Sequence, residues 1–226
     1  MSEPEKLAEE SAENEAGPAS GRGQGPIWHL PNQLTAARLI LSVVFFVILA
    51  IETHWNLNRQ LVLNICFVVF ILAVITDFLD GYLARLWGLT STFGRIADPF
   101  ADKIVICGGF VMLTGITNFV APWFAVVIIF REFLVSGLRS FFESRGVAFG
   151  AALSGKLKML AQSITIPVVL FYEANVASPI GQDPDLVDRV CYLLTVGCLT
   201  LTLILTVTSC VGYLQRAYLL IQDEQQ

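Results

Sequence analysis

Charged side chains are scarce in this sequence. Only 15% of its 226 residues are Asp, Glu, Lys or Arg, whereas a soluble domain of ordinary composition has about a quarter. Histidine is rarer still: His29 and His54 each stand beside a tryptophan next to an apolar stretch. Trp is typical of the membrane interface, so we assign neither histidine any chemistry. The low charge and the 55% hydrophobic content argue against a soluble helical domain and for a membrane protein.

The sequence also lacks cysteine pairs at the close spacing of metal or redox motifs. Its five cysteines all lie in apolar stretches, which is typical of small buried hydrophobic residues: Cys66, Cys107, Cys191, Cys198 and Cys210. A basic face for nucleic acid is absent as well. The net charge of -5 comes from the two ends of the chain, because residues 1–26 hold six glutamates and Asp223 and Glu224 follow the last apolar stretch.

Composition divides the chain into three parts. Residues 1–26 are rich in Glu, Ala, Gly, Ser and Pro and lack the apolar segment of a signal peptide. They are predicted to be a disordered acidic tail. Residues 27–222 hold the apolar stretches and form the predicted membrane domain, and 223–226 are a short C-terminal tail.

The membrane domain is predicted to be all-α and polytopic, because its apolar stretches are close to the length that spans a bilayer. Polar segments at 84–97, 143–155 and 174–188 separate several of these stretches. Lys and Arg gather on one side of the resulting topology, and that side should be cytoplasmic. Both termini are then cytoplasmic, which agrees with an even number of spans. The six predicted spans are 33–52, 60–83, 98–117, 121–142, 156–173 and 189–215.

Four aspartates lie at or beside the second and third spans: Asp77, Asp80, Asp98 and Asp102. Helical spacing places Asp77 and Asp80 on one face, and Asp98 and Asp102 on another. The connection between the two spans is short, so the two faces can meet at the cytoplasmic edge. Charged groups at bilayer depth each cost a few kcal/mol, and four carboxylates at close range repel one another unless countercharge enters.

Hard oxygen ligands suit Mg²⁺ or Mn²⁺, and two ions fit four carboxylates. The cluster therefore predicts a two-metal site. The alternative is that Asp98 caps a helix before Pro99 and that Asp77 and Asp80 simply face the cytoplasm. Gly81 and Ala84 share the face of the aspartates. Small residues in membrane helices usually serve helix packing, but beside metal ligands they would leave room for a flat ligand.

These residues resemble the signature of the CDP-alcohol phosphotransferases, D-x2-D-G-x2-A-R-x8-G-x3-D-x3-D. Every fixed position is present: Asp77, Asp80, Gly81, Ala84, Arg85, Gly94, Asp98 and Asp102. The resemblance implies that the first three aspartates hold two divalent ions on the pyrophosphate of a CDP-linked donor, and that Asp102 both ligates and takes the acceptor's proton. It implies that Gly81, Ala84, Arg85 and Gly94 lie against the CMP moiety. It also suggests a homodimer.

The stretch 31–38 looks like the start of the first span in that family. Asn32 and Thr35 share a helical face and could reach the nucleotide; ordinary N-terminal capping is the alternative.

Two further stretches, 131–139 and 155–162, look like the fourth and fifth spans of phosphatidylglycerophosphate synthases. Arg131 and Arg139 lie roughly on one helical face, and two guanidiniums aimed at one cavity suit a phosphate. The alternative is that Arg131 pairs with Glu132 and that Arg139 reaches out to the interface. Lys158 continues a polar stripe and is favoured for substrate, whereas Lys156 could be an interfacial charge.

The resemblance implies an integral membrane enzyme of phospholipid biosynthesis, expected in a bacterial inner membrane. It would transfer a phosphatidyl group from CDP-diacylglycerol to sn-glycerol 3-phosphate, giving phosphatidylglycerophosphate and CMP. Rival acceptors for the same chemistry are phosphatidylglycerol, which would give cardiolipin, and inositol phosphate. An ion-coupled transporter is the rival of another class. It is disfavoured because the carboxylates sit at one membrane edge and no internal repeat is visible.

Overall fold

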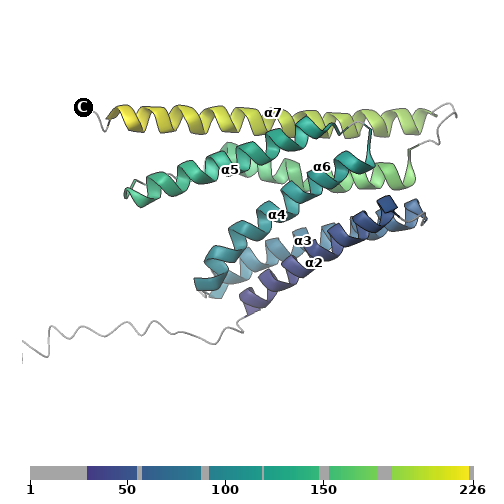
Figure 1. The fold of residues 1–226 in the computed structure, drawn as a ribbon, viewed down its shortest axis with the longest axis horizontal. Coiled ribbons are helices and arrows are strands. Elements are labelled where there is room, and N and C mark those ends of the chain that lie inside the picture. The colour runs from purple at the N-terminus through teal and green to yellow at the C-terminus, as the bar shows by residue number, and fades with distance from the viewer. Residues whose placement is uncertain are drawn as a thin grey trace, which may run out of the picture.

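The computed structural model describes residues 30–54, 58–87, 92–118, 120–147, 153–177 and 185–223. Every regular element within these ranges is an α-helix, as predicted (Figure 1). Each of the six predicted apolar spans corresponds to one helix. The helices are α2 (Leu30–His54), α3 (Arg59–Trp87), α4 (Thr92–Ile116), α5 (Pro122–Ser144), α6 (Leu153–Asn175) and α7 (Leu186–Asp223). The predicted N-terminal tail, 1–26, lies outside the described residues.

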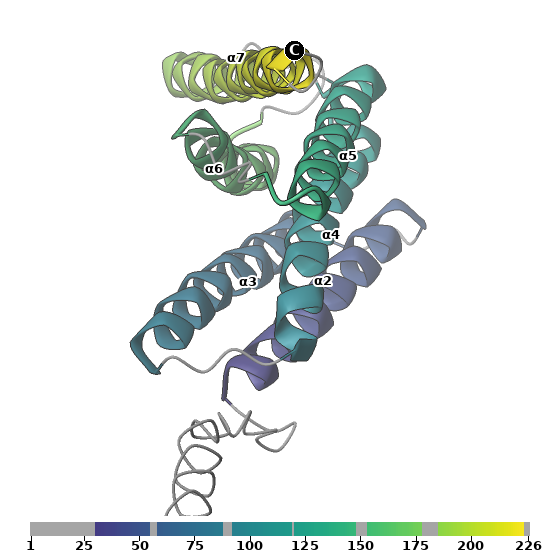
Figure 2. The ribbon, with the colours of Figure 1, turned by 90° about the vertical axis from the view of Figure 1, so that its left-hand side faces the viewer.

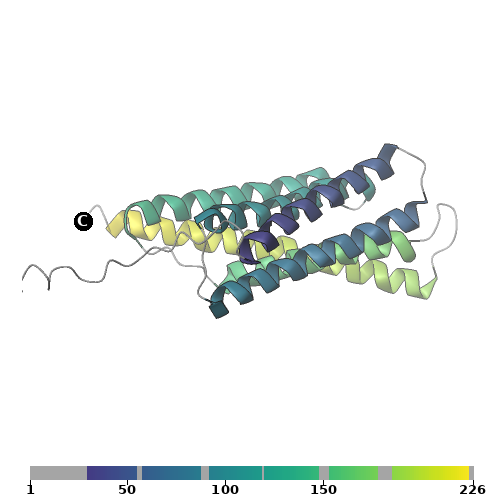
Figure 3. The same cartoon turned by 90° about the horizontal axis from the view of Figure 1, so that it is seen from below.

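The bundle is organised around α4, which packs against α2, α5 and α6. In the end-on view of Figure 2, α4 crosses the α2–α3 pair and leads to α5, while α3 packs directly against α6. The view from below shows that the helices share one long direction (Figure 3). This arrangement brings α4 beside every helix that carries a predicted substrate or metal residue except α3.

Three of the helices begin or end with local signals. Asn58 accepts the backbone N–H of Leu61 at 3.3 Å at the start of α3, and Asp185 accepts that of Asp188 at 2.8 Å at the start of α7. These side chains satisfy donors that the first turn leaves unpaired. At the end of α5, Gly146 has a φ of +75°, a left-handed conformation that glycine adopts without steric cost.

Two predicted connections are shorter than expected. Because Asp185 caps α7, the helix includes Asp188, which was predicted to lie in a polar loop over 174–188. Asp188 is buried and accepts a hydrogen bond from the Tyr172 hydroxyl at 2.9 Å. The predicted connection 84–97 shortens in the same way, because α3 continues to Trp87 and α4 begins at Thr92. Charged residues at these helix ends do not interrupt the helical backbone.

Aromatic side chains fill the centre of the bundle. Phe45, Phe70 and Phe110 come from three helices and are each at most 2% exposed. Helices α2 and α4 approach closely at Gly108, where a Cβ atom would clash with the ring of Phe46. A smaller cluster joins α5 to α7 through residues that include Phe142.

Three of the described helices are long and apolar enough to cross a membrane: α3 over Arg59–Leu79, α6 over Leu153–Asn175 and α7 over Leu186–Gln222. Apolar side chains also cover much of the outer surface of the bundle, which is the arrangement that lipid tails stabilise. The chain is therefore an integral membrane protein. Helices α4 and α5 carry charged residues inside their apolar stretches, and those residues form the site described below.

An ion-pair cluster ties four helices together at one end of the bundle. Arg59 on α3 lies 3.0 Å from Glu52 of α2 and 3.0 Å from Glu173 of α6. It also donates to the carbonyl oxygen of Ile116, at the end of α4, at 2.8 Å. Helix α3 begins at this end, and Asp77 lies about five turns further along it. The aspartate signature therefore lies at the other end of the bundle.

Candidate active site

Two of the signature aspartates meet at one arginine. Asp77 on α3 and Asp102 on α4 both contact Nη1 of Arg38 on α2, at 2.6 and 2.5 Å. Arg38 is 2% exposed, whereas the two carboxylates remain partly open to solvent. The predicted meeting of the two carboxylate-bearing helices therefore holds for these two residues, and a third helix supplies the positive charge between them.

The remaining signature residues lie on the same helices. The backbone of α3 carries Asp80, Gly81, Ala84 and Arg85, that of α4 carries Gly94 and Asp98, and that of α2 carries Asn32 and Thr35. Their side chains lie outside the described part of the structure. Their predicted roles toward metal and CMP therefore stay predictions.

The donor chemistry fits a hard divalent cation. Asp77 and Asp102 offer carboxylate oxygens, which Mg²⁺ and Mn²⁺ prefer. Both carboxylates already pair with the guanidinium of Arg38, so this site accommodates positive charge. Among the side chains that the structure describes, no three potential metal ligands lie together. A two-metal site thus needs Asp80 and Asp98 as well.

A polar cavity of about 720 Å³ opens beside Asp102 and lies among α4, α5, α6 and α7. Its charged lining has two signs. The carboxylates are Asp102, Glu132 and Glu143, and the cations are Lys103, Arg131, Arg139, Lys156 and Lys158. All four residues that the sequence assigned to an acceptor phosphate therefore lie on one cavity, which also contains the proposed base.

Residues of α7 hold Arg131 in this cavity. Its side chain is buried and donates two hydrogen bonds, 3.1 Å from Nε and 2.8 Å from Nη2, to the hydroxyl of Ser209. Its guanidinium also lies 5.7 Å from the centre of the Tyr213 ring. The alternative pairing with Glu132 is present too, at 3.4 Å. Arg131 thus has structural partners and still faces the cavity.

Arg139 lies two turns further along α5 and reaches the same tyrosine. Its Nη2 is 3.5 Å from the hydroxyl of Tyr213, and its Nε is buried without a hydrogen-bond acceptor among the described residues. The side chain is half-buried on the cavity wall. The side chain therefore contributes to the cavity; the alternative, that it reaches out to the membrane interface, stays a prediction.

The two lysines of α6 differ in burial, as expected from the polar stripe that includes Lys158 and not Lys156. Lys158 is 1% exposed and forms an ion pair with Glu132 of α5. Lys156 is exposed at the rim of the cavity. Gly155 brings this turn close to Tyr213, whose hydroxyl would lie 3.3 Å from a Cβ atom at that position.

Sequence reasoning missed the residues that position this site. Arg38 was counted only as a charge on the cytoplasmic side, and Ser209 and Tyr213 were not singled out. A signal was present on α7, where Thr202, Thr206 and Ser209 recur at helical spacing inside an apolar stretch and are all buried. A polar stripe in an otherwise apolar helix indicates a protein-facing side.

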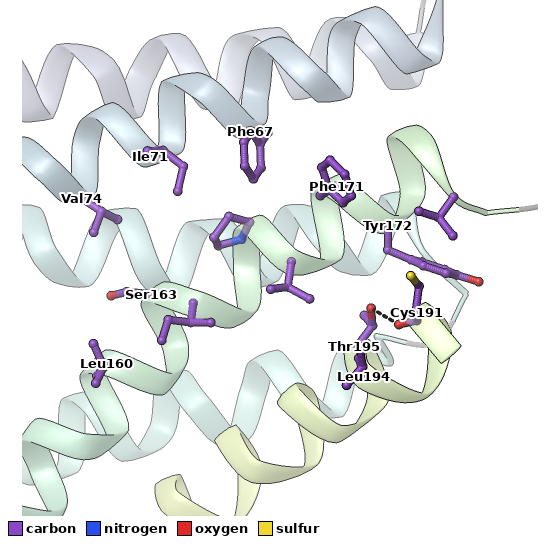
Figure 4. A pocket seen from close by; sticks show the side chains of 14 residues that line it. Phe67, Ile71, Val74, Leu160, Ser163, Phe171, Tyr172, Cys191, Leu194 and Thr195 are labelled. Atoms are coloured by element: carbon purple, nitrogen blue, oxygen red, sulfur yellow. Dashed lines mark hydrogen bonds between the residues drawn. The ribbon is translucent and has the colours of Figure 1, made fainter. Parts of the chain in front are cut away.

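A second cavity has different chemistry. It encloses about 530 Å³ among α3, α6 and α7. Figure 4 shows Phe67, Ile71 and Phe171 turned toward it, and Thr195 bonded to the backbone of its own helix. None of the described side chains that line it is charged. This cavity suits lipid tails or packing, and it offers no group for phosphate chemistry.

Comparison with known proteins gives consistent results. A family model described as CDP-alcohol phosphatidyltransferase matches residues 28–208. A Bacillus subtilis protein named CDP-diacylglycerol--glycerol-3-phosphate 3-phosphatidyltransferase is 33% identical over 152 residues, which are 65% of this chain and 78% of the relative. Proteins with the same name from Cereibacter sphaeroides and Rickettsia typhi are 38% and 35% identical. Each match covers 63% of this chain, with 63% of the first relative and 76% of the second.

Proposed function

The chain belongs to the CDP-alcohol phosphatidyltransferase family, and from that premise we propose that it transfers a phosphatidyl group from CDP-diacylglycerol to sn-glycerol 3-phosphate. The relatives' printed name states this reaction. One observation in the structure carries the choice of acceptor. The cavity that contains Asp102 also contains Arg131, Arg139 and Lys158. An acceptor that bears a phosphate at one end and a reactive hydroxyl at the other fits such a cavity.

The cations of the cavity hold the acceptor. Arg131 and Lys158 are fixed by Ser209 and Glu132 before substrate arrives, so little ordering remains when the phosphate binds. Arginine forks and a lysine charge together suit a phosphate monoester. With the phosphate at these residues, the free hydroxyl of the acceptor points toward Asp102.

Asp102 then acts on the hydroxyl proton. Arg38 fixes its carboxylate from the side of α2. In the proposed step the carboxylate accepts the proton, the acceptor oxygen bonds to the lipid-side phosphorus, and the bond from that phosphorus to the CMP oxygen breaks. CMP leaves with the bonding electron pair, and the proton passes from Asp102 to solvent. General-base assistance of this kind contributes about 10²–10⁴-fold.

Asp77, Asp80, Asp98 and Asp102 would hold two Mg²⁺ or Mn²⁺ ions. Bound there, the ions would neutralise the pyrophosphate of the donor. All four aspartates lie on α3 and α4, and Asp77 and Asp102 both pair with the guanidinium of Arg38. We place CMP beside Gly81, Ala84, Arg85 and Gly94, with Asn32 and Thr35 within reach of the nucleotide.

All six helices cross the membrane in this proposal. The apolar length of α3, α6 and α7 supports it, and the charges that interrupt α4 and α5 line the polar cavity, where they avoid lipid. The Lys and Arg distribution supports a cytoplasmic site and cytoplasmic termini in a bacterial inner membrane. Green fluorescent protein fused to the C-terminus should fluoresce, and a dark but inserted fusion would contradict this orientation.

The family resemblance supports a homodimer, which light scattering of the detergent-solubilised protein would test.

An acceptor panel tests the proposed reaction. Purified protein with CDP-diacylglycerol should release CMP when sn-glycerol 3-phosphate is added. Phosphatidylglycerol and inositol phosphate should release little. If only phosphatidylglycerol causes CMP release, the protein makes cardiolipin and the proposed acceptor is wrong. If only inositol phosphate causes CMP release, the acceptor is inositol phosphate.

A further inference from the structure

We propose that Gln162 is a further acceptor-binding residue, whose side-chain amide donates a hydrogen bond to the phosphate of the acceptor. This inference rests on the proposed function. Gln162 lies on α6, is 1% exposed and lines the polar cavity. Its Nε2 is buried and has no acceptor among the described residues. Buried amide groups in proteins are nearly always hydrogen-bonded, so a buried donor that lines a cavity needs an explanation.

The neighbours of Gln162 on the same helical face are all satisfied. Lys158, one turn earlier, is paired with Glu132. Thr165, one turn later, bonds Thr202 at 2.7 Å and the carbonyl oxygen of Ala161 at 2.8 Å. The stripe therefore has its internal partners in place on both sides of Gln162. Within this stripe of α6, only the Gln162 amide lacks an acceptor among the described residues, and on α5 the Nε of Arg139 on the same cavity lacks one too. This is the pattern expected of groups whose partner is a ligand.

The position of Gln162 selects the phosphate end of the acceptor. Helix α6 enters the cavity at Gly155 and Lys156, so Gln162 lies about two turns deeper than the rim. Asp102 belongs to α4 and to the cluster with Asp77, where the donor is expected. Lys158, one turn earlier on the same face, and Arg131 on α5 line the same cavity. A neutral amide donor on the same cavity as these two cations would orient the phosphate through a directional hydrogen bond and would add no charge.

Gln162→Met is the central variant, because it keeps length and removes the donor. We expect kcat/KM for sn-glycerol 3-phosphate to fall roughly ten- to a hundredfold, the usual range for a lost hydrogen bond to a charged group. The KM for CDP-diacylglycerol should stay within about twofold. Gln162→Glu keeps the shape and places a carboxylate next to the phosphate, so its loss should be larger. Both variants overturn the inference if the acceptor KM is unchanged.

Thermal unfolding separates binding from a structural role. Because Nε2 has no partner among the described residues, Gln162→Met should leave the Tm unchanged or raise it. Thr165→Val is the matched control on the same stripe: it removes a satisfied hydroxyl, so it should lower the Tm and leave the acceptor KM unchanged. A Tm loss in Gln162→Met equal to that control, with normal kinetics, would make Gln162 structural.

Inorganic phosphate identifies the part of the acceptor that Gln162 contacts. It should compete with sn-glycerol 3-phosphate, and its inhibition constant should rise in Gln162→Met by about the same factor as the acceptor KM. An unchanged inhibition constant would place the contact on a hydroxyl and overturn the assignment to phosphate. If wild-type protein releases no CMP with sn-glycerol 3-phosphate, the proposed function and this inference both fail. If wild type is active and Gln162→Met is equally active, only this inference fails.

Discussion

Arg131 of α5 directs two of its nitrogens at the hydroxyl of Ser209 on α7, at 3.1 and 2.8 Å. The two residues are 78 positions apart in the chain. A guanidinium buried in a membrane protein requires such partners, and Ser209 provides one without neutralising the charge. Glu132 lies 3.4 Å from Arg131 and also pairs with Lys158, so these three residues together keep one positive charge for a ligand. Ser209 sets the geometry of Arg131 and need not touch that ligand.

Ser209→Ala should raise the KM for sn-glycerol 3-phosphate roughly three- to tenfold. The variant removes the hydroxyl that orients Arg131 and leaves the charge in place, so only part of a charged hydrogen bond is lost. The KM for CDP-diacylglycerol should not change. Thr208→Val is the control, because that hydroxyl is exposed and bonds only the backbone of its own helix. Equal kinetics for the two variants would show that Ser209 does not position Arg131.

Arg139→Ala should raise the KM for sn-glycerol 3-phosphate at least about tenfold and that for CDP-diacylglycerol much less, because its fork would bind the acceptor phosphate. Initial rates with each substrate varied in turn give both constants. Arg145→Ala provides a control from the end of the same helix, where the exposed side chain stacks on Phe141. Parallel increases in both constants would indicate that Arg139 supports the fold.

Arg38→Gln should lower both activity and stability. The variant removes the cation between Asp77 and Asp102, and unpaired carboxylates at a crowded site cost roughly 1–3 kcal/mol of unfolding free energy. Thermal unfolding in detergent measures the loss. Asp77→Asn in the Arg38→Gln background should recover part of the Tm without recovering activity, because it relieves repulsion and removes a proposed ligand. Wild-type turnover in Arg38→Gln would exclude Arg38 from the site.

Asp102→Asn and Asp77→Asn should differ. Asp102→Asn keeps shape and removes proton-accepting power, so kcat should fall about 10²-fold or more while donor binding changes little. Asp77→Asn should weaken both metal and donor binding as well as turnover. The measurement is kcat and donor Kd for each variant across a Mg²⁺ titration. Rescue of Asp102→Asn to near wild-type rate by high Mg²⁺ would make Asp102 a ligand and not the base.

EDTA should abolish CMP release, and added Mg²⁺ or Mn²⁺ should restore it, because the four carboxylates that we propose for one site would need divalent countercharge. Circular dichroism of the chelated protein controls for unfolding, because a loss of helix would also stop CMP release. Full turnover in excess chelator would contradict the two-metal proposal.

The sequence predicted the helical class and one helix for each apolar span, because long apolar stretches can cross a bilayer only as satisfied backbone. Helix ends were less accurate. Asp188 shows the reason: a charged residue was taken to end a helix, but Tyr172 satisfies it in three dimensions. Spacing along one chain does not reveal a partner on a neighbouring helix.

The site was predicted in the same uneven way. Periodicity placed Asp77 and Asp102 on faces that could meet, and the polar stripe favoured Lys158 over Lys156. Arg38 and Ser209 were not anticipated in these roles, because each acts across a helix–helix contact with a residue distant in the chain: Asp102 is 64 positions from Arg38, and Arg131 is 78 positions from Ser209. Such contacts depend on how α2 and α7 pack against the rest of the bundle, which local periodicity does not determine.

The length of α7 sets the depth at which the chemistry takes place. From Leu186 to Tyr213 the helix rises about 40 Å at 1.5 Å per residue, whereas the hydrocarbon layer is about 30 Å thick. If Leu186 lies near one boundary of that layer, Tyr213 stands at the level of the opposite headgroups. The polar cavity then opens where the phosphates of the lipids lie. A water-soluble acceptor can enter from the aqueous side, and a lipid donor can present its phosphorus there while its tails remain in the hydrocarbon.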